Sequence, residues 1–317
     1  MDYYYKDTGL KGYSSTEVDG KPYFVDEETG ELVPAIPSWL PAGTRSYTPQ
    51  SQRLYELRKK EEQEQEESVQ KKKYYRDLNK ELGDYYFAET QDIRKVLSAQ
   101  SVARLIFLGT FLRYDSDLLY ISERSPLTKK KLQSVMRLSE KTFYRFWIEV
   151  AGKYLSETPE GSVKVEKAFF RGSMKSKHGN GILPCHYQKI YIAALRELYY
   201  RTPPTKHRYL GYIFSILPYV NWEFNILTKN PEETDLDKLE LLSLDELCEM
   251  LNYDKSQRSR LIEAYKQLTF EWDGKQQRFL SFVTDDPKHG SYKIFINPHV
   301  MYCGNDWKRV EVLGAFF

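Results

Sequence analysis

Two stretches of the chain share one pattern of apolar and polar positions, 115 residues apart. The first runs from Leu127 to Val150 and the second from Leu242 to Tyr265. Aligned without a gap, they match apolar residues with apolar residues at positions 127/242, 132/247, 135/250, 136/251, 138/253, 146/261, 147/262 and 150/265. An internal repeat of this kind indicates that one structural unit occurs twice.

Each stretch predicts two short helices joined by a tight turn. Thr128 and Ser243 can cap a first helix, and Ser139 and Asp254 can cap a second one. Ser243 also stands three residues before Glu246, which is the spacing of a capping box. Between the caps, apolar residues recur at helical spacing. Two helices joined so closely must cross, as in the helix-turn-helix that places its second helix in the DNA major groove.

The flanking segments extend this unit. An apolar helix is predicted before each pair, at 104–112 and at 208–217, and strands are predicted after each pair, at 162–170 and at 279–283 with 291–296. We therefore expect a mainly α fold with small β-wings: two tandem winged helix-turn-helix units, plus an N-terminal hairpin and a charged helix.

These elements suggest four parts of the chain. We expect an N-terminal hairpin and extended linker (1–50), a charged connecting helix (51–100), a first winged unit (101–181) and a second winged unit (182–317). The hairpin is expected to turn at 28–30. Glu and Lys at i, i+4 offsets favour an exposed helix in the charged segment, although a dimerising helix is the alternative. We expect each winged unit to fold alone.

Polar residues near the start of each second helix are candidates for reading bases. They would face outward if the apolar positions face the core, and Arg suits guanine while Gln suits adenine. The candidates are Lys141, Thr142, Tyr144 and Arg145 in the first copy, and Lys255, Ser256, Gln257, Ser259 and Arg260 in the second. The match weakens at Arg258, which stands opposite Phe143. The alternative is a scaffold, because any exposed helix start is polar.

The net charge is only +2, but positive and negative residues are concentrated in different segments of the chain. Residues 127–181 contain twelve Lys or Arg against five Asp or Glu, whereas residues 211–254 contain two against ten. A basic stretch over the first helix pair is what phosphate neutralisation requires, although charge runs also mark solvated faces. The phosphate-binding candidates are Lys129, Lys130, Lys131, Lys164, Lys167 and Arg171. The acidic stretch suggests a face turned away from DNA or toward a basic partner.

Composition narrows the class of protein. Hydrophobic residues at 41% allow real cores, and no apolar run approaches the roughly 18–20 residues of a membrane helix. We expect no membrane association, and the absence of a secretory signal with only three cysteines predicts a reducing cytoplasm. The chain has no phosphate loop, and its histidines lack metal-ligand spacing. We therefore expect no catalysis, no cofactor and no metal. A metal-dependent nuclease using the acidic loop 232–237 is a lesser alternative.

The segment from Gly290 to Gly304 resembles a family. Its strand ends in Ile296-Asn297-Pro298, a few residues before Gly304, and is similar to the wing of replication initiators and regulatory proteins of Gram-positive plasmids and phages. The segments 198–214 and 225–235 look like related phage proteins, so the resemblance covers about 100–317 loosely. The chain departs from the family in having two units and a long N-terminal part.

The resemblance implies sequence-specific binding of double-stranded DNA in replication initiation or transcription regulation, without catalysis. Replication or transcription proteins are further candidate partners. Two linked units can act as a pseudo-dimer in a monomer, with a homodimer as the alternative. The runner-up function is a docking module of a phage assembly.

Overall fold

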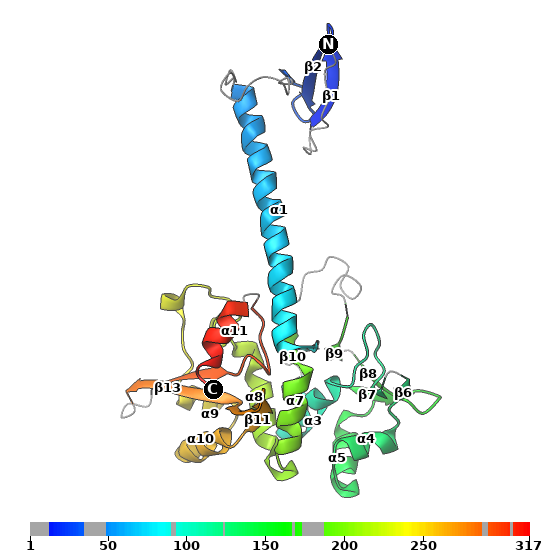
Figure 1. Cartoon of the computed structure of the whole chain (residues 1–317). Helices are drawn as coiled ribbons and strands as arrows, with labels where there is room; N and C mark the ends of the chain where they lie inside the picture. Colours follow the sequence, from blue (N-terminus) through cyan, green and yellow to red (C-terminus); the bar gives the residue numbers. More distant parts are fainter. Residues whose placement is uncertain are drawn as a thin grey trace. The chain divides into compact units, whose positions relative to one another are not determined.

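The computed structural model describes residues 13–34, 49–89, 93–122, 124–166, 169–172, 187–286, 291–304 and 307–317. The chain divides into two compact units, Met1–Lys73 and Tyr74–Phe317. Figure 1 shows both units.

The fold is of the mixed class, with 45% helix and 25% strand in small antiparallel sheets. The prediction of a mainly α protein built from tandem winged helix-turn-helix units is therefore wrong. The fold contains strands whose partners lie far away in the chain, and these strands were not predicted. Two hairpins that turn at Asp-Gly pairs were not predicted either, although Asp-Gly is a strong hairpin signal.

The first unit contains a three-stranded antiparallel meander. Its strands are β1 (Tyr13–Val18), β2 (Lys21–Asp26) and β3 (Leu32–Pro34), paired in that order. The hairpin predicted around residues 28–30 joins β2 to β3. The turn from β1 to β2, which was not predicted, uses Asp19 and Gly20 at φ 51° and 73°, the left-handed conformation that two-residue hairpins need.

Helix α1 (Pro49–Leu82) begins in the first unit and ends in the second. It covers the first part of the segment 51–100 for which a charged helix was predicted, but it ends at Leu82, and residues 85–89 form a strand. Its described side chains up to residue 73 are mostly exposed. Its last turn is different, because Leu78 and Leu82 are fully buried against Tyr191 and Tyr302 in a small cluster of the second unit.

The second unit repeats one order of elements: a helix, two short helices joined by a turn, and a hairpin. Repeat 1 (residues 99–165) comprises α3 (Ala99–Gly109), α4 (Lys129–Val135), α5 (Glu140–Val150), β7 (Leu155–Glu157) and β8 (Val163–Val165). Repeat 2 (residues 207–296) comprises α8 (His207–Ile216), α9 (Leu244–Met250), α10 (Arg258–Lys266), β13 (Leu280–Asp286) and β14 (Ser291–Ile296).

Backbone hydrogen bonds confirm that the two repeats correspond. Leu119 N donates to Val163 O at 3.0 Å, and Leu227 N donates to Ile294 O at 2.9 Å. Each bond ties the segment after the first helix to the last strand of the hairpin. The apolar pattern repeated in the sequence thus reflects a repeated backbone arrangement.

The tight turns also correspond. Arg137 and Asn252, 115 positions apart, both adopt the left-handed conformation, at φ 52° and 49°. A left-handed residue just after a helix ends it and redirects the chain. The turn is therefore set by backbone geometry rather than by one residue type.

Repeat 2 contains an additional hairpin between α10 and β13. Strands β11 (Thr269–Trp272) and β12 (Lys275–Arg278) turn at Asp273 and Gly274, with φ 49° and 71°. Among the described residues, repeat 1 has no counterpart of this hairpin.

A three-stranded antiparallel sheet links the repeats. Its strands are β10 (Tyr187–Tyr191), β4 (Tyr85–Glu89) and β9 (Phe169–Phe170), in that order. The remaining elements are α2 (Ile93–Val96), β5 (Tyr120–Ser122), β6 (Ser125–Pro126), α7 (Ile192–Arg201), η1 (Pro204–Lys206), η2 (Leu217–Tyr219), η3 (Leu236–Lys238), η4 (Lys255–Gln257) and α11 (Trp307–Gly314).

The repeats share one hydrophobic core. Helices α3 and α8 pack against each other so closely that a Cβ on Gly211 would lie 1.6 Å from the carbonyl oxygen of Ala99. Phe107 of α3 also stacks on Tyr199 of α7, with ring centroids 3.7 Å apart. A single buried cluster runs through both repeats.

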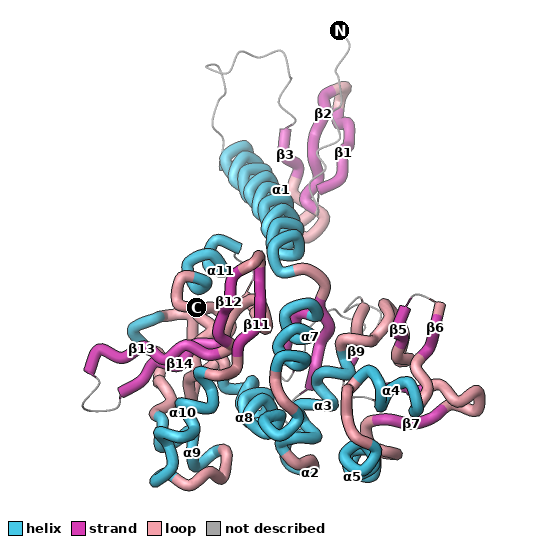
Figure 2. The backbone as a smooth tube through the Cα atoms, turned by 60° about the horizontal axis from the view of Figure 1, so that its bottom comes forward, coloured by secondary structure: helices cyan, strands magenta, loops and turns pink. Residues whose placement is uncertain are grey.

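In Figures 1 and 2, α5 and α10 lie on opposite sides of α3 and α8. Both helices lie in the lower part of the second unit in these views. Across the described ranges, no helix is both long and apolar enough to span a membrane.

Candidate nucleic-acid interface

Helix α5 is strongly amphipathic. The Ser139 hydroxyl caps it by accepting a hydrogen bond from Thr142 N at 3.4 Å. Its buried side consists of Phe143, Phe146, Trp147 and Val150. Burial of these large side chains fixes the helix rotation, and therefore fixes which residues face solvent.

The solvent side of α5 is a stripe formed by Lys141, Tyr144, Arg145 and Ile148, all exposed; we call it the α5 face. At ~100° per residue these positions fall within about 100° of each other. Glu149, beside the stripe, is tied to the protein, because it accepts hydrogen bonds from both the hydroxyl and the backbone nitrogen of Ser98.

Three of the four base-reading candidates of repeat 1 lie on the α5 face. Within the described part of the chain, Lys141 and Arg145 make no ion pair, so both cations point unpaired into solvent. Thr142 differs, because its hydroxyl accepts a hydrogen bond from Ser139 Oγ at 2.9 Å and belongs to the helix cap. Ile148 was not among the predicted residues, although it stands one turn after Tyr144.

The phosphate candidates of α4 differ in their surroundings. Lys130 is exposed, and Lys131 Nζ donates to Ser125 Oγ at 3.2 Å. Lys129 lies 3.6 Å from a Glu157 carboxylate oxygen and 4.6 Å from the centroid of the Trp147 ring. The start of α4 therefore presents three cations, one of them partly neutralised.

The other phosphate candidates are less available. Lys164 pairs with Glu166 at 3.4 Å. Arg171 donates to Leu112 O at 3.2 Å and to Asp84 Oδ2 at 2.5 Å, which makes it a link within the fold. Lys167 lies outside the described residues.

The second helix pair begins differently from the first. Asp254 caps η4 rather than a full helix, accepting hydrogen bonds from Ser256 N at 2.9 Å and Ser256 Oγ at 2.8 Å. The prediction that Asp254 caps the second helix is therefore wrong, since α10 starts at Arg258 with Gln257 at its N-cap. Arg258, the mismatch to Phe143, is exposed rather than buried.

Carboxylates of α9 neutralise much of this second surface. Lys255 pairs with Glu249, and Arg258 pairs with Asp245 at 2.8 Å. Hydrogen bonding to Lys229, together with the capping bonds from Ser243, lowers the pKa of Glu246 to about 2. In the second helix pair, Lys255 and Arg258 are thus paired internally, whereas Arg260 has no ion pair among the described residues.

Few of the predicted base readers of repeat 2 remain available. Gln257, Ser259 and Arg260 are exposed, whereas Lys255 and Ser256 are held by carboxylates. Among the described residues, the first surface therefore has two exposed cations without an ion pair, Lys141 and Arg145, whereas the second has one, Arg260.

In the acidic loop 232–237, carboxylates accept hydrogen bonds from the loop's own backbone. Glu233 Oε1 accepts hydrogen bonds from Thr234 N and Asp235 N, both at 2.9 Å, and Asp235 pairs with Lys238 at 2.9 Å. Within the described ranges, no group of three or more His, Cys, Asp or Glu residues is placed to hold a metal ion.

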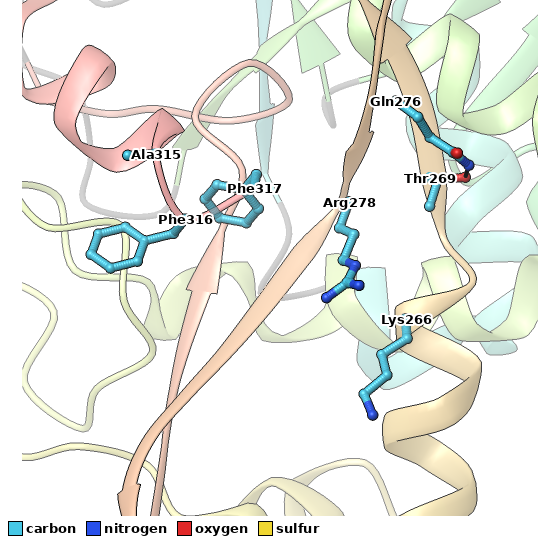
Figure 3. A pocket seen from close by; sticks show the side chains of 7 residues that line it. All are labelled: Lys266, Thr269, Gln276, Arg278, Ala315, Phe316 and Phe317. Atoms are coloured by element: carbon cyan, nitrogen blue, oxygen red, sulfur yellow. Dashed lines mark hydrogen bonds between the residues drawn. The ribbon is translucent and has the colours of Figure 1, made fainter.

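An open pocket of about 590 Å³ lies beside the end of α10. Figure 3 shows its lining: Lys266, Thr269, Gln276, Arg278, Ala315, Phe316 and Phe317. Its polar groups are partly engaged, because Lys266 pairs with Glu263 at 2.7 Å and Gln276 donates to Thr269 Oγ1 at 3.0 Å.

Comparison with known proteins adds no relative: no family model, curated protein or solved structure matches the chain.

Proposed function

We propose that this protein binds double-stranded DNA in a sequence-specific manner, without catalysis, and acts in replication initiation or transcription regulation of a phage or plasmid. The observation that carries the proposal is the α5 face, an exposed helix surface whose two cations, Lys141 and Arg145, make no ion pair with any described residue. Such a role would place the protein in the cytoplasm with the DNA.

The arrangement around α5 suits a DNA major groove. An α-helix fits the groove, where the Arg145 guanidinium can form two hydrogen bonds with a guanine edge. The lysines at the start of α4 can hold phosphates, which fixes the register without reading sequence. Helix α5 would then contact the bases, and α4 would contribute the salt-dependent contacts with phosphates.

The shared core supports a pseudo-dimer within one chain. The equivalent helices α3 and α8 pack on each other, and α5 and α10 lie along one edge of the unit (Figure 2). We propose that the monomer spans two half-sites, about one helical turn (~10 bp) or a multiple of it apart. The internal ion pairs of repeat 2 favour the first surface as the stronger one.

Selection of DNA from a random pool, followed by fluorescence anisotropy at two salt concentrations, tests the proposal. We expect one enriched sequence and an affinity that falls as salt rises. Lys141→Ala and Arg145→Ala should each weaken that affinity by roughly 1–3 kcal/mol. Lys59→Ala, on the exposed part of α1, is the matched control.

Two results would contradict the proposal. One is a pool in which no sequence is enriched; the other is an affinity that both variants leave unchanged while circular dichroism shows a normal fold. Binding that does not depend on salt would favour a docking function instead.

A further inference from the structure

Two large side chains with apolar surface, Tyr144 and Ile148, are exposed next to each other on the α5 face. Tyr144 is 63% exposed and Ile148 is 59% exposed. They stand four residues apart on the helix, so they are neighbours on its surface. Within the described residues, Tyr144 makes no hydrogen bond and no ring contact. Among the described residues of the second unit, no contact therefore accounts for the exposure of this pair.

The surroundings of the pair are cationic. Lys141 and Arg145 complete the same stripe, and the nearby Glu149 is turned to Ser98. The ligand that fits must therefore combine negative charge with small apolar groups. A DNA major groove has this combination, because the methyl group at C5 of thymine projects into it between two rows of phosphates.

Repeat 2 lacks the apolar pair. Ser259 and Glu263 occupy the positions that correspond to Tyr144 and Ile148, 115 residues later. Glu263 is paired with Lys266 at 2.7 Å. The apolar pair therefore occurs on α5 and is not a general property of the repeated helix.

We propose that Tyr144 and Ile148 contact thymine methyl groups, so that the first half-site contains thymines and the α5 face distinguishes DNA from RNA. This inference rests on the proposed DNA-binding function. Uracil lacks the methyl group, and the major groove of an RNA helix is too narrow for side chains to read. The two residues lie ~6 Å apart along the helix axis, which corresponds to about two base steps of ~3.4 Å.

The experiment uses the full chain and the DNA sequence that selection enriches. Each thymine of the site is replaced in turn by deoxyuridine, which removes only the methyl group, and affinity is measured by fluorescence anisotropy. We expect one or two positions at which affinity falls about fourfold, the factor that corresponds to one buried methyl group.

Variants of α5 show which side chain contacts each thymine methyl group. With Tyr144→Ala or Ile148→Ala, we expect weaker binding and equal affinity for the thymine and deoxyuridine sites at the corresponding position. Val312→Ala, which removes a 65% exposed apolar side chain of α11, and Glu263→Ala are controls that should keep the fourfold discrimination. All four side chains are solvent-facing, and thermal melting verifies that each variant is folded.

Three outcomes decide the matter. If selection enriches no sequence, the proposed function itself fails. If a sequence is enriched but deoxyuridine is tolerated everywhere, the function stands and the inference is overturned. If discrimination persists in both the Tyr144 and Ile148 variants, thymine is read elsewhere and the inference is likewise overturned.

Discussion

Gly211 has no side chain at the point where α8 crosses α3. A Cβ there would meet the Ala99 carbonyl oxygen at 1.6 Å and the carbonyl carbon at 2.4 Å. Backbone atoms cannot rotate away as the end of a flexible side chain can. The close approach of the two helices, and with it the joint between the repeats, therefore depends on this glycine.

We expect Gly211→Ala to lower the free energy of unfolding by at least the ~1–3 kcal/mol typical of overpacking. Urea denaturation followed by circular dichroism measures it. Gly314→Ala, which meets nothing within 4 Å, serves as the control and should change stability little. Equal stability of the two variants would contradict the close helix contact.

His207 is a buried titratable group at the start of α8. Its ring lies 3.1 Å from Thr202 O and packs against Tyr199. Burial, aided by the positive charge of Arg104, lowers the pKa of His207 to about 4 from an ordinary value of 6.5. The unfolded chain therefore binds this proton more readily than the folded chain.

The sign of the pH dependence follows. The contribution of His207 is fully present above pH 6.5 and is lost as pH falls toward 4, a change of about 3 kcal/mol at most. We expect His207→Gln to flatten the fall of unfolding free energy between pH 7 and pH 4, measured by urea denaturation across that range. An unchanged slope would show that the histidine does not titrate there.

At the scale of elements, the helices with capping residues were predictable. Thr128, Ser139 and Ser243 each cap the helix that the sequence predicted, because capping is local chemistry. Strands β4 and β10 were not predicted, since each is short and its partner is distant in the chain. The hairpins at Asp19–Gly20 and Asp273–Gly274 were predictable from a two-residue signal that was overlooked.

The candidate interface was predictable only in part. Helical spacing placed Lys141 and Arg145 outward, because a buried apolar side fixes the opposite side of a helix. Spacing could not show that Lys255 and Arg258 pair with carboxylates of α9, since that depends on how two helices cross. Helical spacing also could not show that Arg171 is bonded within the fold, unlike the exposed lysines, because its partners Leu112 and Asp84 belong to distant segments.

The pairing of α9 with α10 makes a prediction of its own. Asp245→Asn with Glu249→Gln should release Arg258 and Lys255, and so strengthen DNA binding and steepen its salt dependence by about 0.9 per added phosphate contact. Anisotropy titrations over a salt series measure the slope. Asp237→Asn, exposed and outside any described ion pair, removes a charge without releasing a cation. A slope shared by both variants would mean that net charge alone is responsible.

At the scale of the whole molecule, the shared core joins the repeats into one folding unit. Burial of α3 against α8 and pairing of β4 with β10 leave neither repeat with a complete core. This arrangement argues against our expectation that each half folds alone.

We expect residues 74–317 to unfold in one cooperative transition, and fragments 74–172 and 187–317 to remain largely unfolded. Circular dichroism melts and the dispersion of amide proton resonances distinguish these cases. The intact unit serves as the reference for both fragments. A fragment with dispersed resonances and its own sharp melt would show that its core is self-sufficient.

The inequality of the two repeats has a consequence for orientation. A symmetric dimer binds a palindrome identically in either direction, so it cannot tell upstream from downstream. Here one chain carries Tyr144 and Ile148 on one side and Ser259 and Glu263 on the other. Under the proposed DNA-binding function, a molecule with two unlike binding surfaces would bind its site in one orientation, and any protein that it recruits would stand on a defined side of that site.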